Sequence, residues 1–149
     1  MTAYERAQRY VGEITELAGT ESHPLIQWWL SLCRFGPNAD HETPWCSAFV
    51  NGIAWEMRLP RSKSAAARSW LLVGTPVRVE EAIAGYDVVV LKRGEGKQPG
   101  PDVIAAPGHV GFYAGLEGDD VLVLGGNQSN GVSIARFKRS AVLGVRRLA

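Results

Sequence analysis

The stretch Thr43-Pro44-Trp45-Cys46-Ser47-Ala48-Phe49-Val50-Asn51 is the part of the chain around which the rest is organised. Thr43 is a typical N-cap residue, Pro44 suits the first helical position, and the apolar residues that follow recur at helical spacing. We therefore expect a helix to begin here, with Cys46 in its first turn. Free backbone N–H groups and the helix dipole at that position favour a thiolate, the nucleophilic form of cysteine.

The chain has two cysteines, too few and wrongly spaced for a disulfide framework or a zinc finger. Cys33 falls on one helical face with Ile26, Trp29 and Leu30, so we interpret it as a core residue. The motif around Cys46 is equally compatible with a nucleophile and with a small buried side chain. A Cys33–Cys46 disulfide is a further alternative, and it would remove the nucleophile.

The composition indicates an ordinary globular protein. The 149 residues are 46% hydrophobic and 21% charged, which predicts one domain over residues 1–149. A net charge of +1 provides no field that would attract nucleic acid or an anionic membrane. The polar start lacks the apolar centre of a secretory signal, and no run approaches the roughly 18 apolar residues of a membrane span. We expect a monomer made in the cytoplasm, without membrane insertion, that another system delivers to any target outside.

The hydrophobic period changes from helical to strand-like in the middle of the chain. Helical spacing predicts helices over 4–17, 22–35 and 43–58, and a helical turn over 64–70. Alternating apolar runs then predict strands over 86–92, 109–114, 121–124, 132–137 and 142–147, with a surface loop over 94–108. Helices followed by strands indicate an α+β fold, with the N-terminal helices packed on one side of a small curled antiparallel β-sheet.

Two polar residues in the strand half can complete a site around Cys46. His109 begins a strand, and alternation puts it on one face with Gly111, which leaves space beside the imidazole. Asn127, in a turn after the neighbouring strand, can accept a hydrogen bond from an imidazole N–H and hold the ring toward Cys46. The ordinary alternatives are a satisfied strand histidine and a simple turn. Cysteine, histidine and asparagine in this order fit the nucleophile, base and orienting residue of a papain-like site.

Four motifs in this order resemble the CHAP-type (cysteine, histidine-dependent amidohydrolase/peptidase) group within the NlpC-like papain-fold superfamily, above all its short bacterial and phage members. They are Glu42 to Asn51, Tyr86 to Val90, Gly108 to Tyr113 and Gly125 to Asn130. The resemblance covers roughly residues 7 to 147. It implies a papain-like fold, peptidoglycan as the partner, and hydrolysis of amide bonds in its peptide part without a cofactor.

The resemblance also implies roles for single residues. Cys46 would be the nucleophile, His109 the general base and then acid, and Asn127 the orienting residue, with the Cys46 backbone N–H as one oxyanion donor. Many papain-like enzymes have a glutamine shortly before the cysteine as second donor. The sequence has none there, so Gln128 is a candidate for that function.

The tryptophans near the motifs have two interpretations. Trp45 and Trp70 are candidates to line a groove for sugar or peptide, although core packing is the commoner position of a tryptophan.

Three functions remain as alternatives. The first is a peptidoglycan hydrolase, either an endopeptidase or an N-acetylmuramoyl-L-alanine amidase, acting as a phage lysin or a delivered effector. The second is a cell-wall-binding or phage structural module that keeps the fold without catalysis. The third is a zinc-dependent amidase with His41, Cys46 and His109 as ligands and Asp40 or Glu42 as base, although the chain has no paired-ligand motif.

Overall fold

The computed structural model describes residues 1–14, 23–33, 44–129 and 131–149. The α-helices are α1 (Ala3–Gln8), α2 (Pro24–Ser31) and α3 (Cys46–Glu56), followed by the 3-10 helix η1 (Ala67–Leu72). Helix α1 is shorter than the predicted range of 4–17. After Gln8 the backbone continues in turns, with N–H groups of Arg9, Tyr10 and Val11 bonded three residues back, and Gly12, with a positive φ of 76°, donates its N–H to the Val132 carbonyl. Residues 15–17 of the predicted range lie outside the described residues. No helix in these ranges is long and apolar enough to cross a membrane.

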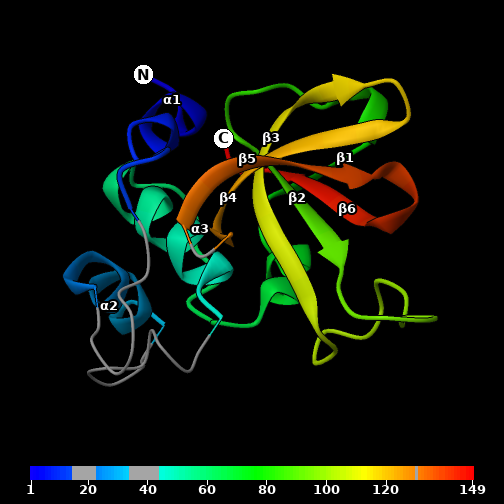
Figure 1. Cartoon of the computed structure of the whole chain (residues 1–149), viewed down its shortest axis with the longest axis horizontal. Coiled ribbons are helices and arrows are strands. Elements are labelled where there is room, and N and C mark those ends of the chain that lie inside the picture. The colour runs from blue at the N-terminus through cyan, green and yellow to red at the C-terminus, as the bar shows by residue number, and fades with distance from the viewer. Residues whose placement is uncertain (15–22, 34–43, 130) are drawn as a thin grey trace.

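Six antiparallel strands form one sheet in the order β1-β6-β2-β3-β4-β5 (Figure 1). Their bounds are β1 (Thr75–Val77), β2 (Asp87–Lys92), β3 (Gly108–Glu117), β4 (Asp120–Gln128), β5 (Gly131–Lys138) and β6 (Val142–Arg147), with 3-10 turns η2 (Val79–Glu81) and η3 (Arg139–Ala141). The five predicted strands are confirmed, and β1 was not predicted. Gly74-Thr75-Pro76, which overlaps its start, is typical of a turn, but Pro76 is tolerated because β1 is an edge strand that pairs with β6 alone.

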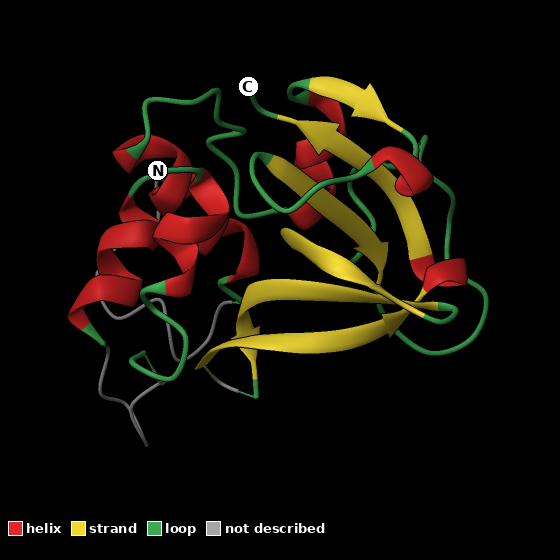
Figure 2. Ribbon diagram, turned by 90° about the horizontal axis from the view of Figure 1, so that it is seen from above, coloured by secondary structure: helices red, strands yellow, loops and turns green. Residues whose placement is uncertain are grey.

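The sheet curls and carries the helices on one side, as the view in Figure 2 shows. Alternate side chains of β2 and β3 divide between two hydrophobic clusters. Val88, Val90 and Phe112 pack with the helices, whereas Val89 and Leu91 belong to a second cluster on the other face. The architecture is therefore α+β, with N-terminal helices on a small curled antiparallel sheet, as the sequence predicts.

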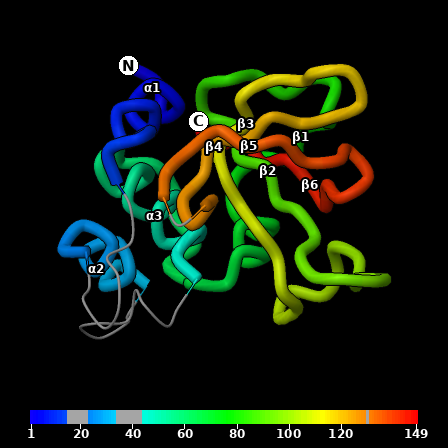
Figure 3. The backbone as a smooth tube through the Cα atoms, viewed as in Figure 1, coloured from blue at the N-terminus to red at the C-terminus, as the bar shows by residue number. Residues whose placement is uncertain are grey.

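Helix α3 packs against β3 and β4, although more than 50 residues separate them in the chain (Figure 3). Phe49 lies at the centre of this contact, with its ring edge-to-face against Trp29 at 5.0 Å and against Phe112 at 6.2 Å between centroids. This packing fixes the start of α3 beside the first residues of β3.

Candidate active site

Cys46 is the first residue of α3. Thr43, the expected N-cap, lies outside the described residues, and the structure has Trp45 at the N-cap position with no side-chain capping bond. Trp45 instead holds the start of the helix by packing, because its indole is fully buried and stacks on Trp29. Since Cys46 opens the helix, its backbone N–H has no acceptor within the helix and is available to a ligand.

The Cys46 side chain is 2% exposed and borders a hollow of about 380 Å³. We call this the cysteine hollow; it is lined by Pro44, Cys46, Ala65, Ala66, Ala67, Arg93, Ala105, Ala106, Pro107 and Gly108. Its wall over 105–108 is the end of the loop that the sequence predicts beside the site.

Burial raises the pKa of the Cys46 thiol. The backbone N–H of Val110, the charge of Arg93 and the N–H groups at the helix start lower it, but they do not offset the burial. The expected thiolate at the helix start is therefore wrong for the resting protein, because desolvation of the sulfur outweighs the helix terminus. A neutral thiol must lose its proton to a base before it can attack.

A polar network behind Cys46 anchors α3 to the segment that follows it. Ser47 Oγ accepts a 2.9 Å bond from the Trp70 indole N–H and donates one of 2.6 Å to the Ser64 carbonyl. Asn51 Oδ1 accepts from the Lys63 N–H at 2.9 Å. Trp70 is fully buried in this network, so the expectation that it lines a substrate groove is wrong. The same correction applies to Trp45, because its stacking on Trp29 leaves no exposed surface for a substrate.

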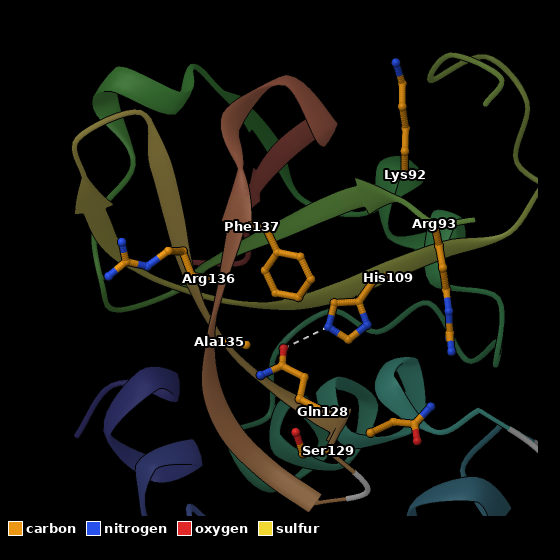
Figure 4. A pocket seen from close by; sticks show the side chains of 9 residues that line it. Lys92, Arg93, His109, Gln128, Ser129, Ala135, Arg136 and Phe137 are labelled. Atoms are coloured by element: carbon orange, nitrogen blue, oxygen red, sulfur yellow. Dashed lines mark hydrogen bonds between the residues drawn. The ribbon is translucent and has the colours of Figure 1, made fainter. Parts of the chain in front are cut away.

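His109 is the second residue of β3 and is 7% exposed. It borders the second hollow, of about 320 Å³, which we call the histidine hollow (Figure 4). The hollow is lined by Lys92, Arg93, His109, Asn127, Gln128, Ser129, Ala135, Arg136 and Phe137. Phe137 stacks on the imidazole at 5.2 Å between centroids and so restricts rotation of the ring.

Gln128 fixes the proton position on His109. Its Oε1 lies 2.8 Å from His109 Nε2, and its Nε2 donates to the carbonyls of Ser133 at 2.8 Å and Val123 at 3.3 Å. Because the amide nitrogen faces carbonyls, Oε1 faces the ring, and His109 Nε2 must carry the proton that it donates. The other ring nitrogen, Nδ1, then has a free lone pair and can act as a base.

Gln128, not Asn127, orients His109, which corrects the assignment made from the sequence. The register between β4 and β5 shifts between Gly125 and Gln128, and Asn127 has a positive φ of 58°. This bulge breaks the alternation of the strand and turns Gln128 toward the imidazole. Asn127 lines the histidine hollow without a hydrogen bond to His109. The amide of Gln128 is fully used, so it is not free to serve as an oxyanion donor.

Burial lowers the pKa of His109, and the charge of Arg93 lowers it further, while the hydrogen bond to Gln128 raises it. Both shifts favour the uncharged forms, a thiol at Cys46 and an imidazole at His109. No hydrogen bond joins the two side chains, which both belong to the described part of the chain. They border adjacent hollows that share Arg93, an arrangement that a bound substrate can tighten.

The structure tests the disulfide alternative fully and the zinc-site alternative in part. Cys33 and Cys46 are both free, and burial raises the pKa of Cys33 to about 11, as expected for a core cysteine. His41, Asp40 and Glu42, which a zinc site would need, lie outside the described residues. Among the residues that the structure describes, no group of three histidine, cysteine or carboxylate side chains could hold a metal.

Known protein families and curated proteins give no match to this sequence. Among solved structures, the chain is similar to NlpC1 from Trichomonas vaginalis, with a TM-score of 0.52 and 16% identity. The chain has an NlpC-like fold. The likeness covers 99% of this chain and 44% of NlpC1, so the chain spans less than half of the length of that protein. At this identity the likeness establishes the fold alone. The chemistry of the chain depends on Cys46, His109 and Gln128.

Proposed function

We propose that the protein is a cysteine hydrolase that cleaves an amide bond in the peptide part of bacterial peptidoglycan. The observation that carries the proposal is the Gln128 amide, whose carbonyl partners force the proton onto His109 Nε2 and leave a free lone pair on Nδ1. Cys46 begins helix α3 and borders the neighbouring hollow, which shares Arg93 with the hollow of His109. A histidine with one nitrogen held by an acceptor and the other free is what a cysteine nucleophile needs from its base.

The geometry supports the following sequence of steps. His109 Nδ1 takes the proton of the Cys46 thiol as the sulfur attacks the amide carbonyl. The N–H of Cys46, which has no acceptor within the helix, donates to the developing oxyanion. The imidazolium, stabilised by the Nε2–H bond to Gln128, then protonates the leaving amine. Water activated by His109 hydrolyses the thioester and restores the free thiol.

The substrate class rests on the similarity to NlpC1 and on the CHAP-type motifs of the sequence. Both an endopeptidase and an N-acetylmuramoyl-L-alanine amidase use this chemistry, and they differ in the bond that lies over Cys46. The proposed site of action is the cell wall.

The test is incubation of purified sacculi with the wild-type protein, Cys46→Ala and the matched control Cys33→Ala. New amino groups, new reducing ends and fragment masses are measured together. We expect amino groups from the wild type and Cys33→Ala but none from Cys46→Ala, and the masses identify the bond. Full activity of Cys46→Ala, or reducing ends alone, would contradict the proposal.

Two further controls separate the alternatives. Loss of wild-type activity in 1,10-phenanthroline that zinc restores would support the zinc amidase. Retained binding to sacculi without any product from either protein would support a binding module.

A further inference from the structure

Arg93 borders the hollows of both functional side chains. It follows the last residue of β2, and its side chain is part of the lining of both the cysteine hollow and the histidine hollow. In Figure 4 the Arg93 side chain extends along His109 on the side away from Gln128. Its guanidinium charge acts on both reacting groups and lowers the pKa of Cys46 and of His109.

No described residue pairs with the Arg93 side chain. Within the described residues it makes no side-chain hydrogen bond or ion pair, and it is exposed. Most of the arginines around the sheet are paired, including Arg136 with Glu117 and Arg147 with Asp87. Among the described residues, no aspartate or glutamate lines either hollow, whereas the histidine hollow has Lys92 and Arg136 as well. The described charged residues that line the two hollows are therefore all positive, although the whole chain has a net charge of only +1.

A planar guanidinium with free donors is suited to a carboxylate, which it binds through two parallel N–H···O bonds. A substrate amide that spans the cysteine and histidine hollows must pass Arg93. A free carboxylate one residue from the scissile bond would reach it there, and would neutralise a charge that otherwise disfavours the imidazolium.

We propose that Arg93 is a specificity residue that binds a free carboxylate of the substrate beside the scissile amide. The inference rests on the proposed function and adds to it the chemical class of substrate, a peptide with an unamidated carboxyl group next to the cleaved bond. Peptides in which that group is a carboxamide are then poor substrates.

The first experiment needs no substrate and measures the alkylation of Cys46 by iodoacetate and by iodoacetamide. These reagents form the same carbon–sulfur bond and release iodide, but only iodoacetate carries a carboxylate. The rates are followed by mass spectrometry of the peptide containing Cys46 in the wild type, Arg93→Gln, Arg93→Lys and the control Lys97→Gln, an exposed lysine that is in the lining of neither hollow.

We expect Arg93→Gln to lower the ratio of the iodoacetate rate to the iodoacetamide rate on the order of tenfold, as for loss of a charge-assisted contact. Arg93→Lys should recover part of the ratio, and Lys97→Gln should leave it within about twofold of the wild-type value. An equal fall in both rates would overturn the proposal, because Arg93 would then act only on the ionisation of the thiol.

The second experiment uses a pair of synthetic stem peptides that differ only in a carboxylate or a carboxamide next to the scissile bond. Arg93→Gln should lower kcat/KM for the carboxylate peptide on the order of 10-fold to 100-fold, mainly through KM, with little change for the carboxamide peptide. Equal losses on both peptides would overturn the inference and leave the proposed function intact. Cleavage of neither peptide by the wild type, together with an Arg93-dependent alkylation ratio, would contradict the proposed function and support the carboxylate site.

Discussion

Gln128 Oε1 accepts a 2.8 Å hydrogen bond from His109 Nε2 inside the protein, where both residues are 7% exposed. The bond is directional because the Gln128 amide nitrogen is bound to the carbonyls of Ser133 and Val123. This pair decides which imidazole nitrogen is available to a nucleophile, and most of the predictions below depend on it.

The tautomer of His109 can be observed without a substrate. We expect two-bond ¹H–¹⁵N correlation spectra at pH 8 to show a protonated Nε2 and an unprotonated Nδ1 on His109. Gln128→Leu, which has a similar size but no acceptor, should lose this single tautomer. The opposite tautomer in the wild-type protein would contradict the assigned direction of the hydrogen bond.

Substitutions of Gln128 should move the pKa of His109 in opposite directions. The hydrogen bond to Gln128 raises that pKa, so Gln128→Leu should lower it, and a carboxylate in Gln128→Glu should raise it because a negative charge favours the imidazolium. NMR titration of His109 measures both shifts. The acid limb of kcat/KM should move to higher pH in Gln128→Glu. Gln128→Leu should also lose on the order of tenfold to a hundredfold in kcat, part of what acid–base catalysis supplies.

Gly125 protects the same hydrogen bond by leaving space for it. A Cβ at this position would lie 2.5 Å from Gln128 Oε1 and 3.3 Å from His109 Nε2. We expect Gly125→Ala to displace the Gln128 amide and to reduce activity nearly as much as Gln128→Leu, with far-ultraviolet circular dichroism unchanged. The matched control is Gly100→Ala, because a Cβ there has no atom within 4 Å. Wild-type activity in Gly125→Ala would show that the hydrogen bond is not needed.

The buried imidazole should make the folded state sensitive to mild acid. Burial lowers the pKa of His109 from its ordinary value of 6.5, so the unfolded chain binds a proton that the folded chain does not. The free energy of unfolding contributed by His109 is therefore complete above about pH 6.5 and is lost as the pH falls toward the folded pKa. Urea unfolding at pH 7.5 and 5.5 should show a larger loss for the wild type than for His109→Gln. An equal loss in both proteins would contradict the lowered pKa.

Substitution of Ser47 should lower the free energy of unfolding without changing the chemistry at Cys46 and His109. Its hydroxyl is the acceptor for the buried Trp70 indole N–H at 2.9 Å, and Ser47→Ala leaves that donor unpaired. The expected cost is about 1–3 kcal/mol in the free energy of unfolding, measured in urea. Ser69→Ala is the control, because the Ser69 hydroxyl makes its bond to the Ala66 carbonyl at the surface and should cost less than about 1 kcal/mol. A Ser47→Ala protein as stable as the wild type would show that Trp70 finds another acceptor.

The local features of the site follow from the sequence. Apolar periodicity predicts five of the six strands and places Cys46 at the beginning of a helix and His109 at the beginning of a strand. These predictions hold because helix starts and strand alternation depend on neighbouring residues, and the order of helices before strands restricts the fold to an α+β layer arrangement.

Only the tertiary structure decides which side chains meet. The bulge in β4 places Gln128, and not Asn127, against the imidazole of His109. Trp45 is buried because it stacks on Trp29, and Trp70 is buried where it donates to Ser47, so neither faces a substrate. Burial also outweighs the helix start at Cys46 and raises the pKa of its thiol.

Arg93 is a further residue whose place in the site depends on the tertiary structure and not on the sequence pattern. The sequence gives it no motif, since it stands between a strand and a loop. The structure makes it the wall shared by the cysteine and histidine hollows, because the end of β2 lies beside the loop over 105–108 and the start of β3. Contacts between segments distant in the chain depend on strand register and packing, which hydrophobic periodicity does not encode. The candidate nucleophile and its base, in contrast, are indicated by the local pattern of residues.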